Sequence, residues 1–332
     1  MRTLAIMAGG DSSERIVSIK SAAFVQEQLD KRIFECYLVD VRGTDWIVPR
    51  GNGTSASINK DDFSFILEGK TKKIDAAIIM IHGTPGENGL LQAYFELLHI
   101  PYSTCGVLAS ALTFNKHLTK SLLNEYRIKS PKGLLLKKNG ALSAEEIVSY
   151  LGMPIFVKPN ESGSSFGVSK IKSRDELAAA IEQALKEGRE VILEGFIRGT
   201  EMTCGIYRSK AETIVLPIAE IVPKNEFFDY AAKYQPGLSE EIIPARISED
   251  AANRCRGMTA RIYDILGCRG VVRMDYIERD GELYFLEVNT VPGMSPASIV
   301  PKMLHAAGIS ITTLYKTILE DNYDERSSPG TL

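Results

Sequence analysis

Four polar side chains near the C-terminus have the types and the spacing of a site for Mg²⁺ and phosphate. Arg273, Asp275, Glu287 and Asn289 lie in the segment 273–293, RMDYIERDGELYFLEVNTVPG. Carboxylate and amide oxygens are the ligands that Mg²⁺ prefers, usually beside phosphate oxygens. The central Asp-Gly pair predicts a β-hairpin, and successive side chains of a strand point to opposite faces. Each arm therefore places its polar pair on one face, opposite the apolar residues Met274, Tyr276, Tyr284, Leu286 and Val288.

The turn of this hairpin decides whether the two polar pairs share a face. A three-residue loop at 279–281 with a left-handed Gly281 aligns all four groups, whereas a two-residue Asp280-Gly281 turn would separate Asp275 from Glu287. Because the apolar residues also need a common core, the sequence favours the three-residue loop. The alternative for the whole segment is an amphipathic hairpin with a solvated acidic face.

Two further segments could bind a nucleotide. In 157–168, Lys158 ends a predicted strand and precedes a loop containing Gly163, Ser164, Ser165 and Gly167, whose backbone N–H groups and hydroxyls could surround a phosphate. In 191–201, an apolar strand ends at Glu194 and leads through Phe196 and Ile197 to Glu201, which together offer an apolar slot and acceptors for adenine and ribose. The simpler alternatives are a flexible connection and a surface turn.

The stretch 225–237, NEFFDYAAKYQPG, carries four aromatic residues in a sequence that is otherwise typical of a loop. Aromatic side chains in a loop must cover something, so the stretch could be a lid whose Lys233-Tyr234 pair closes over a phosphate. A hydrophobic cluster under a surface loop is an equally good interpretation.

Three other polar residues have adequate structural explanations from local sequence. Glu14 follows Asp11 with the spacing of a helix capping box. Ser298 falls in a helix that Ser295 could cap, with Pro296 at its first position. His82, at the end of an apolar strand, could be a structural histidine.

Composition narrows the class of protein. The chain has 332 residues, of which 44% are hydrophobic and 24% charged, as in ordinary soluble proteins of two or three domains. A net charge of −3 argues against a nucleic-acid partner. The five cysteines form no CxxC pair, and no segment is typical of a signal peptide or a membrane span, so we expect a cytoplasmic protein.

The elements predict an α/β protein in three units and a tail. Residues 1–100 alternate strands (3–7, 35–41, 75–81) with helices, which predicts a parallel sheet with a ligand beyond its carboxyl edge, near Gly9-Gly10 and His82-Gly83. Residues 101–188 should hold helices near 116–126, 144–151 and 175–186. Residues 189–320 open with a strand at 191–194, and 321–332 form a polar, frayed tail.

In order along the chain, these segments resemble the D-alanine–D-alanine ligases of the ATP-grasp superfamily. The resemblance rests on GGDSSE (9–14), HGTPGENG (82–89), FVKPNESGSSFGVSK (156–170), EGFIRGTE (194–201), FFDYAAKY (227–234), GCRGVVRMDY (267–276) and LEVNTVPGMSPASIVP (286–301). It implies an ATP-grasp fold, in which an N-terminal Rossmann-like parallel-sheet domain precedes two α+β subdomains that clasp ATP.

The resemblance also implies roles for particular residues. The residues that would contact the nucleotide are Lys116, Lys158, Ser164, Ser165, Glu194, Phe196, Ile197, Glu201 and Lys233. The residues that would bind two Mg²⁺ (or Mn²⁺) ions are Asp275, Glu287 and Asn289. A trio of Glu14, Tyr234 and Ser298 would orient the first D-alanine, with His82, Lys233 and Ile299 also in the substrate site. Arg273 and the Gly293 N–H would bind the oxyanion. The family often has Asp at Asn88 and an acid at Ile16, positions to which we assign no chemistry.

The implied reaction joins two D-alanine molecules through an acyl phosphate, with ATP becoming ADP, for peptidoglycan precursor synthesis. The expected partners are D-alanine, ATP and a second copy of the chain, with no nucleic acid or membrane, and a K⁺ requirement is left open. Two alternatives remain. One is a D-alanine–D-lactate or D-alanine–D-serine ligase of the same fold, and the other is an ATP-binding module without ligase activity.

Overall fold

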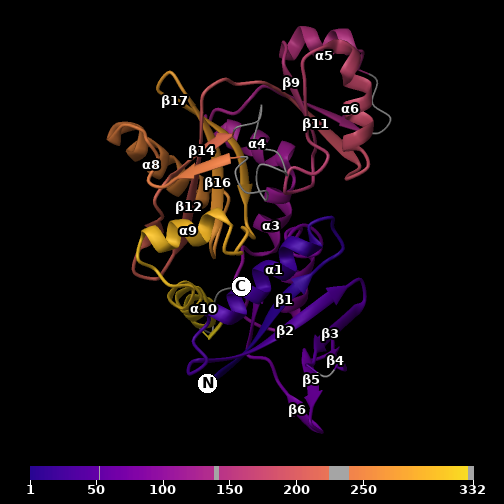
Figure 1. Ribbon diagram of the computed structural model, residues 1–332, viewed down its shortest axis with the longest axis vertical. Helices are drawn as coiled ribbons and strands as arrows, with labels where there is room; N and C mark the ends of the chain where they lie inside the picture. The colour runs from indigo at the N-terminus through magenta and orange to yellow at the C-terminus, as the bar shows by residue number, and fades with distance from the viewer. Residues whose placement is uncertain (52, 138–141, 224–238, 328–332) are drawn as a thin grey trace.

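The computed structural model describes residues 1–51, 53–137, 142–223 and 239–327, and in this part of the chain the strands form three sheets (Figure 1). The first sheet lies at the bottom of the view, the second at the upper right and the third to the left. The lid segment predicted at 225–237, with Lys233 and Tyr234, lies outside the described residues.

The first sheet has seven strands in the order β6-β5-β4-β3-β2-β1-β7. Its strands are β1 (Arg2–Gly9), β2 (Phe34–Arg42), β3 (Asp45–Pro49), β4 (Ser55–Asn59), β5 (Ser64–Leu67), β6 (Lys70–Lys72) and β7 (Ala76–Ile79), with helices α1 (Arg15–Gln28) and α2 (Leu90–Leu97). Only β2, β1 and β7 are parallel. These are the three strands that the sequence predicted as a parallel sheet, and that prediction is confirmed. Strands β3 to β6 extend the sheet with antiparallel pairings that the sequence did not predict.

The polar segment near 50–59 contains strand β4, which the sequence did not predict. Ala56 and Ile58 are buried while the residues between them are exposed. A short strand with polar residues on its exposed face has the composition of a loop, so its pattern is hard to detect.

The second sheet has the order β10-β9-β11-β8 and every pairing in it is antiparallel. It consists of β8 (Gly133–Lys137), β9 (Ile155–Pro159), β10 (Ser169–Ile171) and β11 (Glu190–Gly195), covered by α5 (Ala144–Leu151), the 3₁₀ turn Arg174–Glu176 and α6 (Leu177–Ala184). Strand β11 was assigned to the opening of the third unit, but it pairs with β8 and β9. The loop after β9 and the end of β11 therefore meet at one side of the second sheet.

The third sheet carries the predicted hairpin. Its strands are β12 (Thr200–Arg208), β13 (Thr213–Val215), β14 (Ala219–Pro223), β15 (Ser239–Ile242), β16 (Val272–Arg279) and β17 (Glu282–Asn289), with α8 (Glu249–Ile265). Helices α3 (Val107–Phe114) and α4 (Lys116–Glu125) share its core, since Ala109 and Leu123 cluster with Met202 and Met274.

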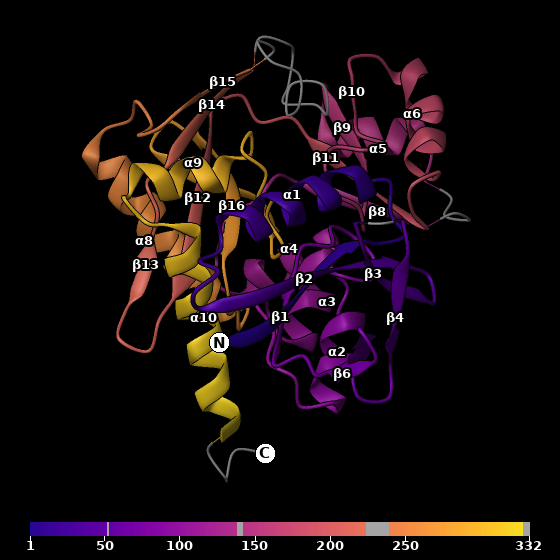
Figure 2. The ribbon, with the colours of Figure 1, turned by 60° about the horizontal axis from the view of Figure 1, so that its bottom comes forward.

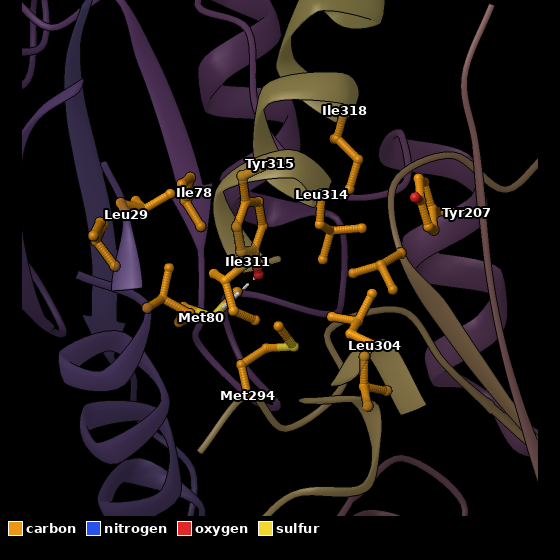
Figure 3. Close-up of a cluster of buried hydrophobic side chains, with 14 of the residues drawn as sticks. Leu29, Ile78, Met80, Tyr207, Met294, Leu304, Ile311, Leu314, Tyr315 and Ile318 are labelled. Carbon is orange, nitrogen blue, oxygen red and sulfur yellow. Dashed lines mark hydrogen bonds between the residues drawn. The ribbon is translucent and has the colours of Figure 1, made fainter. Parts of the chain in front are cut away.

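The first and third sheets are joined by one hydrophobic cluster (Figure 3). Leu29 and Ile78 come from the first unit. Met294 and the helices α9 (Ile299–Ala306) and α10 (Ile311–Ser327) supply the other side, and the Tyr315 hydroxyl contacts the Met80 sulfur at 3.7 Å. Two surfaces that pack this closely hold their loops in a fixed relation.

Helix α10 runs on past the point where the sequence predicted a frayed tail. Its backbone is helical to Ser327, and it extends away from the sheets towards the C-terminus (Figure 2). Within the described residues, no helix has the length and apolar character needed to cross a membrane.

Candidate active site

The predicted hairpin exists, but its turn has two residues and the three-residue prediction was wrong. Arg279 pairs directly with Glu282, and Asp280 and Gly281 between them both have positive φ, 53° and 81°. This geometry is the tight turn that Asp-Gly favours.

A β-bulge nevertheless brings the polar pairs to one face. The register shifts between Asp275 and Tyr276, so that Asp275 pairs with Glu287 while Tyr276 pairs with Phe285, and Leu286 is the extra residue. A bulge changes the side-chain parity of one strand by one residue. It thus compensates for the short turn, and Arg273 pairs with Asn289 as the site requires.

The bulge also changes which residues form the core. Near the turn, the odd-numbered Leu283 and Phe285 are buried, instead of the predicted Tyr284 and Leu286. Leu286 instead lines a large cavity.

That cavity, of about 430 Å³, lies between the second and third sheets. Every described residue that the sequence assigned to the nucleotide lines it. These residues are Lys116, Lys158, Ser164, Ser165, Glu194, Phe196, Ile197 and Glu201, and Asp275 and Glu287 join them. A cavity of this size is suited to a small ligand such as a nucleotide.

Phosphate-binding cations lie at one end of this cavity. The Lys116 ammonium donates to the Ser162 carbonyl, and Lys158 pairs with Glu194 at 2.5 Å. Burial lowers the pKa of Lys116. At Lys158 burial acts in the same direction, but Glu194 and Glu287 outweigh it and raise the pKa. The end of the cavity near these lysines therefore suits an anion.

The other end of the cavity is apolar and aromatic. Phe196 lies beside Phe156, with ring centroids 6.1 Å apart, and the Lys170 ammonium lies 4.0 Å from the Phe196 ring centroid. Flat apolar walls with acidic side chains at their edge suit an adenine base. Glu194 and Glu201 also line this cavity.

The Gly/Ser loop joins the cavity to Glu14. Ser164 and Ser165 have positive φ, 47° and 61°, and the Ser164 hydroxyl donates to the Glu14 carboxylate. A Cβ at Gly163 would lie 2.6 Å from a Glu14 oxygen, so a larger residue there would require the Glu14 carboxylate to move. Glu14 precedes α1 without capping it, and the Asp11 carboxylate accepts from the Gly43 N–H instead, so the capping-box interpretation was wrong.

A second, smaller cavity of about 60 Å³ lies next to the first. Its wall gathers the described residues that the resemblance assigned to the amino-acid site, namely Glu14, His82, Arg273, Gly293, Ser298 and Ile299. Gly163 and Ser164 line both cavities. Glu14 accepts a hydrogen bond from Ser164, and the trio of Glu14, Tyr234 and Ser298 stays a prediction, since Tyr234 lies outside the described residues.

Helix α9 presents Ser298 to this cavity. It begins at Ile299 with Ser298 as N-cap, not at Pro296 as predicted. The Ser298 hydroxyl accepts from the Ser295 N–H at 3.1 Å and lies 2.8 Å from the Ser295 hydroxyl. A Cβ at Gly293 would lie 2.8 Å from the same Ser298 oxygen. The Gly293 backbone and the start of the helix thus form one wall.

Residues 82–87 hold the loop that precedes Gly293. His82 Nδ1 lies 2.8 Å from the Val291 carbonyl oxygen, and Glu87 accepts from the N–H groups of Gly83 at 2.7 Å and Val291 at 3.3 Å. Burial, with a smaller effect of Glu14, raises the pKa of Glu87 to about 8. Sequence analysis missed Glu87, because a glutamate between a turn and a helix gives no local signal of burial.

Arg273 contacts an acid in this structure. Its guanidinium donates to both oxygens of Asp275 at 2.9 and 2.8 Å, and Thr203 donates to the same carboxylate at 2.5 Å. The Asn289 amide lies 3.3 Å from it. Arg273 therefore offsets the negative charge of Asp275 in this structure. It also lines the smaller cavity, where an oxyanion could bind it.

The donor set fits a divalent metal that also binds phosphate. Asp275, Glu287 and Asn289 offer two carboxylates and an amide oxygen on one face of the hairpin. The described residues contain no group of three or more His, Cys, Asp or Glu side chains that could hold a metal ion alone. Mg²⁺ typically binds one or two carboxylates and completes its shell with water and substrate phosphates, so this set is sufficient beside a nucleotide.

Comparisons with known proteins agree with this geometry. The family described as D-ala D-ala ligase N-terminus matches residues 3–105, and D-ala D-ala ligase C-terminus matches residues 129–320. The D-alanine–D-alanine ligase of Phocaeicola vulgatus is 48% identical over 323 residues, which cover 97% of this chain and 99% of the relative.

Solved structures show the same fold. The Bacillus anthracis D-alanine–D-alanine ligase complexed with ATP has a TM-score of 0.79 and 31% identity, covering 99% of this chain and all of that one. The VanG D-Ala:D-Ser ligase of Enterococcus faecalis has a TM-score of 0.83 and 33% identity, covering 96% of this chain and 98% of that one. The chain has the ATP-grasp fold and belongs to the D-alanine–D-alanine ligase family.

Proposed function

We propose that the protein joins two D-alanine molecules into D-alanyl-D-alanine and converts ATP to ADP and phosphate. One observation carries the proposal. A nucleotide-sized cavity and a cavity of amino-acid size share the wall formed by Gly163 and Ser164. An amino acid in the smaller cavity would thus lie next to the phosphate end of the larger one.

In the first step, a carboxylate oxygen of one D-alanine attacks the γ-phosphorus, and the bond to the β,γ-bridging oxygen breaks to release ADP. Two anions must approach each other, so the site needs fixed positive charge. Lys116 and Lys158 lie at the phosphate end of the larger cavity, and Arg273 lines the smaller one. Loss of one such group typically costs about a hundred- to a thousand-fold in rate.

In the second step, the amine of another D-alanine attacks the acyl carbon after losing a proton, and phosphate leaves with its bridging oxygen. The developing oxyanion needs donors that are already in place. The Gly293 N–H and the Arg273 guanidinium are the candidates on the smaller cavity. Glu14, held by Ser164, would receive the ammonium group of the first D-alanine.

Asp275, Glu287 and Asn289 would hold two Mg²⁺ or Mn²⁺ ions. When bound, such ions offset the negative charge of the phosphates. We further infer a homodimer, a cytoplasmic location and a role in peptidoglycan precursor synthesis from the family resemblance. Lys233 and Tyr234, proposed to contact phosphate and substrate, lie outside the described residues.

A D-alanine–D-serine ligase is a second candidate, because the VanG D-Ala:D-Ser ligase, at 33% identity, is as similar as the solved Bacillus anthracis D-alanine–D-alanine ligase. The 48% identity to the Phocaeicola vulgatus enzyme favours D-alanine. The test is incubation with ATP, Mg²⁺ and D-alanine, alone or with D-serine or D-lactate, followed by mass identification of products. We expect dipeptide from D-alanine alone and ADP release that requires D-alanine. Absence of that dipeptide would contradict the main proposal.

A further inference from the structure

Three charged side chains form one buried group at the larger cavity, and two of them, Lys158 and Glu194, line it. Glu194 has its side chain 3% exposed, and its two oxygens pair with different lysines, Lys120 and Lys158. The side chains of these lysines are only 8% and 13% exposed. A buried carboxylate is stable only when its charge is balanced.

The two lysines differ in their access to the ligand. Lys158, on β9, lines the cavity, whereas Lys120, on α4, is absent from its wall. A phosphate entering the cavity can therefore contact Lys158 directly and compete with Glu194 for it. The same phosphate cannot contact Lys120, so this lysine stays paired with Glu194 whatever occupies the cavity.

We propose that Lys120 is a positioning residue for the nucleotide, which keeps Glu194 ionised and aimed at the base while Lys158 is free to contact phosphate. The inference rests on the proposed use of ATP. An ionised Glu194 can only accept hydrogen bonds, so it favours the 6-amino group of adenine over the 6-oxo group of guanine. Lys120 thereby contributes to the choice of nucleotide without touching it.

The charge environment supports this division of roles. Burial lowers the pKa of Lys120 to about 8 against the opposing effect of Glu194, and Lys158 lowers it further. Glu194 itself, despite burial, has its pKa lowered by Lys120 and Lys158. Glu287 is the other acid that acts on both lysines, and it lies towards the phosphate end.

The test compares Lys120→Met, which keeps the length of the side chain without its charge, with Lys120→Arg, which keeps the charge. Lys186→Met is the matched control, since Lys186 is an exposed lysine of the same part of the chain. Binding of ADP and of a non-hydrolysable ATP analogue is measured by calorimetry, and thermal melting reports folding. Neither readout requires ligation, so failure here is distinguishable from failure of the dipeptide assay.

We expect Lys120→Met to weaken nucleotide binding by about tenfold or more, the size expected when a neighbour that orients a contacting group is removed. The KM for ATP should rise more than kcat falls, and the preference for ATP over GTP should shrink. Lys120→Arg should restore most of the affinity, while Lys186→Met should match the unmodified protein.

If Lys120→Met does not fold, the single variant Glu194→Gln is compared with the double variant that also carries Lys120→Met. Once Glu194 is neutral, it no longer needs a charged partner. The second substitution should then cost little further affinity. Nucleotide affinity and selectivity that are unchanged in Lys120→Met would overturn the proposal. So would a loss of kcat alone, or a full additional loss in the Glu194→Gln background.

Discussion

The Glu287 carboxylate connects two neighbouring cavities of the site. It lines both the large cavity and a small one that contains Asn289 and Lys116. Its charge opposes the effect of burial on the pKa of Lys116 and of Lys158. The charge of a residue at this position affects both Lys116 and Lys158 and any metal ion bound beside them.

We predict that Glu287→Gln lowers the rate of phosphate release by about a hundred-fold or more, because the amide keeps the shape but not the charge. The thermal melting temperature should change little. Glu282→Gln, on the same strand but exposed and paired with Lys129, is the control and should keep full activity. Full activity in Glu287→Gln would remove Glu287 from the site.

Glu87 should make the stability depend on pH. Its folded pKa, raised to about 8, exceeds the ordinary 4.5, so between these pH values the folded protein binds more protons than the unfolded chain. Stability contributed by this group is therefore present at low pH and lost as the pH rises from about 4.5 to about 8.

Glu87→Gln should remove that slope, so that the difference in melting temperature between the variant and the unmodified protein changes steadily from pH 5 to pH 8. Glu96→Gln, at a more exposed acid of the same unit, is the control. Parallel pH profiles for the unmodified protein and Glu87→Gln would show that Glu87 is ionised in the folded state at neutral pH.

At the level of elements, the hairpin shows what a sequence can and cannot reveal. Alternation along each strand correctly grouped Asp275 with Arg273 and Glu287 with Asn289, because the period of a strand is local. The turn and the bulge depend on pairing between strands. The predicted turn was one residue too long and the bulge was not predicted, and because these two errors cancel, the four polar groups were still assigned to a common face.

The same distinction explains the other differences. Apolar runs predicted β1 and β7, but the pairing of β11 with β9 and the burial of Glu87 arise from distant parts of the chain. Lys120 went unassigned for the same reason, since nothing near it in sequence indicates that it pairs with Glu194. The site residues that carried a motif were found, and those positioned only by packing were missed.

The bulge yields a prediction about the hairpin. Deleting Leu286 should give a regular hairpin in which Glu287 still lies opposite Asp275, because Leu286 is the one residue without a partner on the other strand. Phosphate release should therefore persist after the deletion. Inserting a glycine after Gly281 should be tolerated, because the bulge lies between the turn and the site. Activity assays with melting curves test both variants. Loss of activity in either variant, with the melting temperature unchanged, would contradict the register.

For the whole molecule, the shared cluster of the first and third sheets is the structural basis of the smaller cavity. His82 and Glu87 from the first unit hold Val291 of the third by its two backbone groups. The second sheet has a hydrophobic core of its own. Its contribution to the smaller cavity is the loop with Gly163 and Ser164, which contacts Glu14 of the first unit.

Leu314→Ala, at a fully buried position in the shared cluster, should lower the free energy of unfolding by about 2–5 kcal/mol. Because the cluster joins two sheets, amide hydrogen exchange should accelerate in both β1 and β12, with β9 and β11 little changed. Ile147→Ala, in the core of the second sheet, is the matched control and should show the reverse pattern. Acceleration confined to β12 would mean that the two sheets open independently, and the loop at Val291 would then be held only by its contacts with His82 and Glu87.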